Sequence, residues 1–483
     1  MTLFHETIPD ENPRCKPLRT TTKRVGFVKY WEIIADSFTG SRENRSQLGI
    51  PHESIFYRKP KSTLRLVMTR LYLACVIIFS VASVRAGVFP DCEYSPPTGW
   101  NSAAGDPVFV LSQDYPTTDP SSSLEQPWKA IDFHQQPAAY MQEIIDYCYE
   151  GNLEVEFRGQ DNAKRKWYHA PWLHPGPNGR EFTHGLTGER LSRARELAAT
   201  QSSTFHNFAV GLYNAAGGYA IGRVWADPNH PDPSKASFPE GTVAFKLLFT
   251  LAAKDQVPYL DGAPEWIADT ERSNDANQIR NNKVRLLQID IAVKDGRSNE
   301  GGWVFGTFQF DSSVVATTPW RQITPVTLMW GNDPTFTPAN YDPAHGHIPQ
   351  ESWINTAAPV VIYRLGLPQS STSPHVLGWA GRGNGPVDNP VSSCLSCHGV
   401  AEQPKAKNML PFGNDDQAKL QWFRNLAPLE AFDNDSHHTS LDFSLQLAVG
   451  IDNQANSAGA HPIFNFFHLF TPRASNISRD PVH

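Results

Sequence analysis

The pattern of apolar and polar residues predicts a β-rich module in the middle of the chain. Five runs between residues 205 and 365 are rich in β-branched and aromatic residues, and several alternate apolar with polar positions. These runs are residues 219–225, 242–250, 284–293, 303–310 and 323–330. Residues 255–282 form a long polar excursion between two of them. We expect these strands to build a sandwich or a barrel-like sheet.

Helical spacing of apolar residues occurs on both sides of this module. Residues 137–150 carry such a pattern and end at Gly151, which is a common helix stop. Residues 415–426 and 440–451 carry the same spacing near the C-terminus. The chain is therefore predicted to be a multidomain α+β protein, with the β-rich module followed by a small all-α domain.

The following boundaries are expected from these patterns and from composition. Residues 87–204 form a loop-rich region with a short helix, residues 205–365 the β-rich domain, residues 366–390 a linker, and residues 391–483 the small helical domain.

An apolar run near the N-terminus predicts export. Residues 71–84 are apolar, follow Met68-Thr69-Arg70 and end close to Ala86, so residues 68–86 read as a signal peptide. The run is shorter than the roughly 20 residues of a membrane span, so no stable span is expected in the mature form. We expect a periplasmic protein with Met68 as the true start. The alternative is that residues 1–67 are a genuine cytoplasmic extension and residues 71–84 an uncleaved membrane anchor.

Charge narrows the choice of partners. Residues 1–86 hold 14 basic and 7 acidic residues, which leaves 28 basic against 42 acidic residues for the rest of the chain. A surface with this excess of negative charge argues against nucleic acid as a partner.

The most specific chemistry lies at Cys394-Leu395-Ser396-Cys397-His398. Two cysteines and a histidine at this spacing are typical of c-type haem attachment, because the thiols add to the porphyrin vinyl groups and the imidazole ligates iron. Zinc binding would need further Cys or His ligands at compatible spacing, and a redox dithiol would need a strand before the motif. A Gly/Pro/Asn-rich stretch precedes it instead.

Around this motif, residues 378–455 resemble a class I cytochrome c domain, which is less than a fifth of the chain. The part before the motif is similar to what precedes it in bacterial proteins described only as cytochrome c family. The resemblance implies one covalent haem c with its iron per chain, thioether bonds to Cys394 and Cys397, and His398 as the proximal ligand. It also implies assembly by haem maturation machinery.

The sixth iron ligand is where the sequence departs from the family pattern. Class I domains place an axial methionine well downstream, whereas the only methionine after this motif is Met409. Met409 is the candidate ligand, with packing against the porphyrin edge as the alternative. The competing histidines are His437, His438, His461 and His468. The first two lie in a polar run that favours solvated loop residues.

Three further features carry weaker expectations. Cys92 and Cys148 are expected to form a disulfide in an oxidising compartment, with two buried free thiols as the alternative. His169 and His174 lie in an aromatic run that favours a packed plug over a cleft lining. Residues 227–233 are rich in Asp and Pro, which favours a surface turn over a calcium site.

Together these features predict an exported mono-haem protein that performs one-electron transfer with a redox partner protein of unknown identity. One alternative is a haem-dependent oxidoreductase in which the β-rich module holds a small-molecule substrate. Another is a haem-based binder or sensor. An open sixth position would favour the alternatives, whereas a Met/His pair would favour electron relay.

Overall fold

The computed structural model describes residues 112–173, 186–268, 282–367 and 376–458, apart from residues 407, 414 and 434. The chain divides into two units, residues 1–86 and residues 87–483, and every described residue belongs to the second. The predicted signal peptide therefore lies outside the described residues. No helix in the described ranges is long and apolar enough to cross a membrane.

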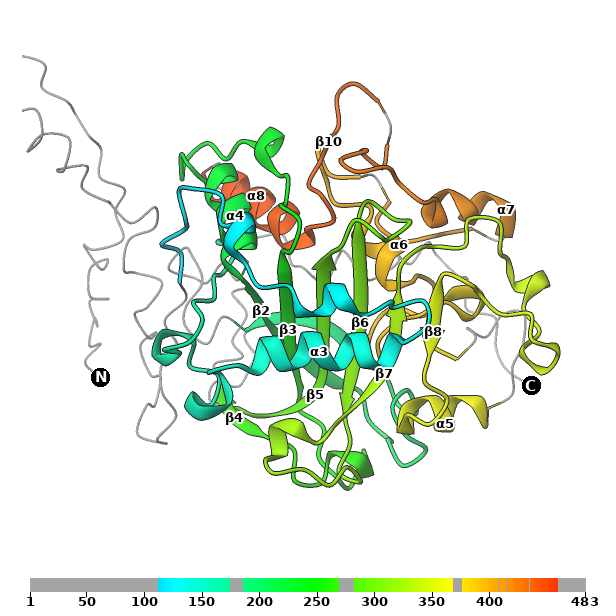
Figure 1. Ribbon diagram of the computed structural model, residues 1–483. Coiled ribbons are helices and arrows are strands. Elements are labelled where there is room, and N and C mark those ends of the chain that lie inside the picture. Colours follow the sequence, from blue (N-terminus) through cyan, green and yellow to red (C-terminus); the bar gives the residue numbers. More distant parts are fainter. Residues whose placement is uncertain are drawn as a thin grey trace, which may run out of the picture. The chain divides into compact units, whose positions relative to one another are not determined.

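A large antiparallel sheet organises the described part of the chain (Figure 1). Its strands run in the order β1-β2-β3-β5-β6-β7-β8, and β4 pairs with β5. Their bounds are β1 Thr187–Ser192, β2 Phe205–Tyr213, β3 Val243–Thr250, β4 Glu265–Ala268, β5 Asn282–Lys294, β6 Trp303–Phe310, β7 Ile323–Met329 and β8 Ser352–Ile354. The molecule is a mixed α/β protein, and the β-rich character predicted from the sequence is confirmed. The strand order is an open path with β1 and β8 at its ends.

Four of the five predicted strands are confirmed as β3, β5, β6 and β7, but residues 219–225 are not a strand. They fall largely in helix α4, Ala215–Val224. The Asn214 side chain caps this helix by accepting a hydrogen bond from the Gly217 amide at 3.2 Å. Its buried residues recur at helical spacing and include Ala220, Ile221 and Val224. This segment is therefore a helix because the Asn214 side chain caps its start, a signal that the strand prediction did not include.

The first face of the sheet is covered by α3, Pro137–Tyr149, which lies across the strands (Figure 1). This confirms the helix predicted over residues 137–150. Its buried side chains join one core with alternate residues of the central strands, among them Phe245, Leu247 and Ile289. Because side chains alternate across a strand, the residues between these positions face the other side of the sheet.

The second face of the sheet packs against the C-terminal segments. These are α6 Cys394–His398, β9 Glu402–Gln403, α7 Asp416–Lys419, β10 Thr439–Ser440 and α8 Leu445–Ala458. The apolar residues of α6, of α8 and of the segments between them form one core with α4 and with sheet residues such as Tyr213 and Phe305. A smaller core lies around α5, Pro359–Leu365. The described C-terminal region therefore shares its core with the sheet.

Candidate functional site

The Cys394–His398 motif forms a single capped helical turn, α6. The Ser393 hydroxyl accepts a hydrogen bond from the Ser396 amide at 3.1 Å, and the Ser396 hydroxyl accepts one from the Ser393 amide at 2.8 Å. This reciprocal capping box fixes the start of the helix. Because residues three apart share a helix face, Cys394 and Cys397 point to the same side.

The His398 ring is held in one tautomer. Its Nδ1 lies 2.9 Å from the backbone oxygen of Phe443, and a carbonyl only accepts, so Nδ1 donates. The lone pair is then on Nε2, which is the arrangement found in metal-ligating histidines. Burial lowers the pKa of His398 to about 4, so the ring is neutral at pH 7. The ring also packs against Phe305 of β6, with the centroids 4.5 Å apart.

A tight turn positions the carbonyl that holds His398. Asp442 and Phe443 have φ angles of 49° and 66°, in the left-handed region that non-glycine residues rarely adopt. The Asp442 carboxylate accepts hydrogen bonds from three groups, which are Lys294 Nζ at 2.6 Å, Trp303 Nε1 at 2.9 Å and the Phe238 amide at 2.8 Å. This carboxylate therefore anchors the turn to the sheet.

The three motif side chains line one cavity of about 1260 Å³, counting its opening to solvent. The opposite wall is the second face of the sheet, and small residues leave it room. They are Ala209, Gly211, Ala244 and Ala292. A side chain at Gly211 would meet Gln446, since a Cβ there would lie 1.8 Å from Gln446 Nε2.

Strand register places apolar and charged residues of the cavity in two neighbouring rows. One row runs Tyr213, Ala244, Ala292 and Phe305 across β2, β3, β5 and β6. Two residues further along the strands, the next row runs Gly211, Lys246, Asp290 and Thr307. The motif therefore faces an apolar surface with a polar row beside it.

The polar row contains a partly buried ion pair. Lys246 Nζ lies 2.9 Å from Asp290 Oδ2 and 3.9 Å from Glu189 Oε1. Asp290 Oδ1 also accepts hydrogen bonds from the Thr307 hydroxyl at 2.8 Å and from Gln288 Nε2 at 2.7 Å. Burial alone would lower the pKa of Lys246, but the neighbouring carboxylates raise it well above its usual value. The lysine is therefore charged at neutral pH.

Asp388 is a further carboxylate of the cavity lining, together with Glu189, Asp290 and Asp442. It accepts hydrogen bonds from the Gly385 amide at 2.9 Å and from Gln288 Nε2 at 3.3 Å. Burial and the charge of Asp290 raise the pKa of Asp388. A carboxyl group with a raised pKa in a cavity is suited to accept and release protons.

The motif thiols are free of disulfide bonds and protonated. Burial, with the nearby charge of Asp388, raises the pKa of Cys397 to about 12 and the pKa of Cys394 well above its usual value. Redox dithiols instead use a cysteine with a lowered pKa. The site therefore lacks the electrostatics of a thioredoxin-like centre.

The structure does not bring the predicted sixth ligand into this cavity. Met409 is buried in the core beside Trp422, whose Nε1 donates to the Asn408 carbonyl at 3.0 Å, and it is not part of the cavity lining. His437 is exposed, and neither it nor His438 lines the cavity. His461 and His468 lie outside the described residues.

The remaining sequence candidates lie away from the motif side chains or beyond the described residues. Cys148 is buried, while Cys92 lies outside the described ranges, so their disulfide stays a prediction. His169 is buried, and burial lowers its pKa to about 3; His174 lies outside the described residues. Residues 227–233 form an exposed turn in which the Asp227 carboxylate accepts a hydrogen bond of 2.9 Å from the Asn229 amide.

Sequence analysis missed the sheet side of the cavity. The available signal was a charged residue flanked by apolar residues within a predicted strand, as at Lys246 in β3 and at Asp290 between Ile289 and Ile291 in β5. Their pairing depends on strand register between segments that are distant in the sequence.

Comparison with protein-family models, with curated proteins and with solved structures finds no match to this chain. The resemblance to class I cytochromes c therefore rests on the motif and its surroundings alone.

Proposed function

We propose that this chain is an exported mono-haem redox protein that carries a covalent haem c in the cavity beside α6. The observation that carries the proposal is that Cys394, Cys397 and His398 line one cavity while Phe443 fixes the His398 tautomer. These residues fit the group: two thiols for the vinyl carbons and a neutral imidazole whose Nε2 is free to ligate iron. When bound, the haem supplies a one-electron couple.

Attachment is a redox-neutral addition of each thiol to a vinyl group. A carbon–sulfur bond forms to one vinyl carbon and a hydrogen adds to the other. The raised pKa values of both thiols make spontaneous addition slow, which supports a need for the predicted maturation machinery. Such machinery operates outside the cytosol, in agreement with the proposed periplasmic location.

We further propose that the haem site belongs jointly to the sheet and the C-terminal segments. The shared core of α6, α8 and the second sheet face supports this arrangement. A separate all-α cytochrome c domain over residues 391–483 stays a prediction, as does the sandwich or barrel form of the β-rich module.

The polar row and the carboxylates beside it favour small-molecule oxidoreduction over simple electron relay as the redox activity of this protein. A relay needs only a closed pair of axial ligands and burial of the haem. This cavity also holds Glu189, Lys246, Asp290 and Asp388, which can hold a polar molecule and exchange protons with it. Met409 does not line the cavity. A redox partner protein would still deliver or remove the electrons.

Haem attachment is tested by producing the full chain with cytochrome c maturation machinery. The variants C394A, C397A and C394A/C397A are compared with wild type and with the control variant C148A. Cys148 is a buried cysteine away from the motif, so C148A controls for loss of a buried thiol. We expect haem that resists acid–acetone extraction in wild type and C148A, and extractable or absent haem in the double variant. Equal covalent haem in wild type and the double variant would overturn the proposal.

A further inference from the structure

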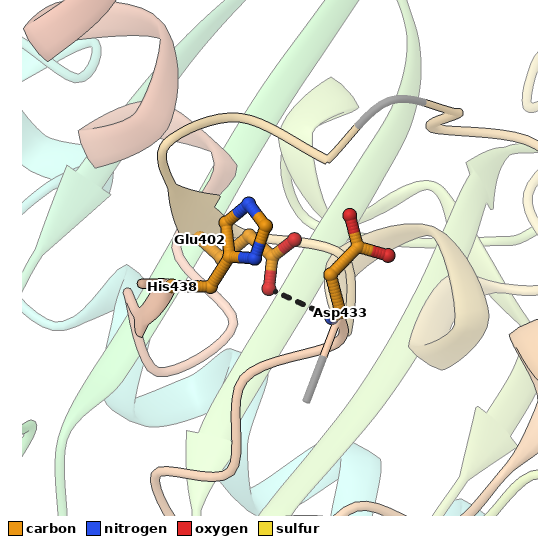
Figure 2. A group of neighbouring side chains, drawn as sticks. All are labelled: Glu402, Asp433 and His438. Atoms are coloured by element: carbon orange, nitrogen blue, oxygen red, sulfur yellow. Dashed lines mark hydrogen bonds between the residues drawn. The ribbon is translucent and has the colours of Figure 1, made fainter. Parts of the chain in front are cut away.

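A second group of potential ligands lies outside the cavity, at the paired strands β9 and β10 (Figure 2). It consists of Glu402 in β9, Asp433 in the connection between the two strands, and His438 just before β10. One ligand atom from each residue lies within 4.8 Å of the others. None of the three lines the cavity that holds the motif.

Two buried atoms in this group lack hydrogen-bond partners. Glu402 is 0% exposed, and its Oε1 has no partner, whereas its Oε2 accepts the Asp433 amide at 3.0 Å. His438 Nδ1 is likewise buried and forms no hydrogen bond of suitable geometry, although Asp435 Oδ1 lies 3.2 Å away. Leaving a buried carboxylate oxygen unpaired costs free energy, so a missing partner is expected at this point. Figure 2 shows the Glu402 carboxylate between the His438 ring and the Asp433 side chain.

The group also lacks a compensating cation. Among the described residues, neither Glu402 nor Asp433 forms an ion pair with Lys or Arg, although Asp435 adds a further carboxylate 3.2 Å from His438 Nδ1. Burial and the charge of Asp433 raise the pKa of Glu402. A divalent cation would both neutralise these carboxylates and satisfy the unpaired atoms.

We propose that Glu402, Asp433 and His438 bind one Zn²⁺ ion. Zinc accepts imidazole nitrogen together with carboxylate oxygen, whereas calcium takes oxygen ligands only. Asp433 and His438 are partly exposed, which leaves a position for water as a further ligand. This proposal is independent of haem binding.

The position of the site gives the ion a structural role. Glu402 pairs with Ser440 between β9 and β10, four residues after the end of the motif helix. On the other strand, Ser440 lies just before the Asp442–Phe443 turn that holds His398. An ion here would fasten both ends of the connection between residues 404 and 438 next to the motif.

Zinc binding is measured by titrating ZnCl₂ calorimetrically into the purified full-length protein after treatment with EDTA. We expect one ion per wild-type chain and a loss in H438Q that exceeds the roughly 10–100-fold cost of removing an outer-shell partner. H437Q is the matched control, because His437 is the exposed neighbour outside the group and its substitution should leave binding unchanged.

D433N provides a second test should H438Q fold poorly, and it should also lose binding. Zinc should raise the unfolding temperature of wild type and H437Q while leaving D433N unchanged. Absence of zinc binding by the wild-type chain, or an equal loss in H437Q and H438Q, would overturn the proposal.

Discussion

Replacing Asp442 by Asn tests how strongly one carboxylate holds the turn behind His398. Asp442 and its partner Lys294 are 1% and 12% exposed, and their charged atoms lie 2.6 Å apart. Asn has nearly the same shape and tolerates the left-handed backbone that Asp442 adopts, so the substitution isolates the charge. It leaves a largely buried ammonium group without its counter-charge.

The expected cost follows from this geometry. Removing one partner of a buried ion pair costs about 3–5 kcal/mol. Lys294 keeps a hydrogen bond to the Gly301 carbonyl at 2.8 Å, which favours the lower end of that range. Asn has one acceptor oxygen for three donors, so at least one further hydrogen bond is lost at about 1 kcal/mol. We expect D442N to lose about 4 kcal/mol of unfolding free energy.

The assay is urea unfolding followed by far-ultraviolet circular dichroism. D416N is the control, because the Asp416–Lys419 pair is more exposed and its loss should cost less than about 1 kcal/mol. The double variant D442N/K294M removes both charges and should recover part of the loss. A cost for D442N no greater than that of D416N would refute the assigned role of the buried pair.

Two further predictions concern ligand binding and pH. In the haem-loaded protein, reduced iron should bind CO readily, and the M409A variant should have the same absorption spectrum as wild type, because Met409 does not line the cavity. A changed spectrum in M409A, together with wild-type iron that resists CO, would favour electron relay. Glu300 is 0% exposed, and burial raises its pKa well above the usual value, so its contribution to stability is present below the unfolded pKa and is lost as pH rises through the folded pKa. In urea titrations, E300Q should therefore gain stability relative to wild type as pH rises from about 5 to about 8, by up to about 1.4 kcal/mol per pH unit. The control variant E154Q, at an exposed glutamate, should show no such trend. Parallel pH profiles of unfolding free energy for E300Q and E154Q would contradict the account.

The strands that could be predicted were those with local signals. β3 and β6 combine β-branched and aromatic residues, β5 and β7 are rich in β-branched residues, and the apolar faces of all four are buried in the structure. Helix α3 was recoverable from its spacing and from the glycine that follows it. Helix α4 was missed because its start depends on the Asn214 cap, while its apolar residues alone also suit a strand.

The candidate site was predictable only where it is local in sequence. The Cys394–His398 motif can be recognised from the spacing of its two cysteines and its histidine. The groups that surround it do not, because Lys246 and Asp290 come together through strand pairing, and Phe443 reaches His398 from 45 residues further along the chain. Met409 was proposed as a ligand for its proximity in sequence, and the structure places it in a core beside Trp422 instead of in the cavity.

The most direct test of the central claim is the mass of the unfolded, full-length protein after production with haem maturation machinery. Thioether bonds survive denaturation, so the account predicts a mass increased by one haem per chain, located by proteolysis on the peptide that contains Cys394 and Cys397. A chain that carries no added mass under these conditions, while the maturation machinery loads a known cytochrome c in parallel, would contradict the haem assignment.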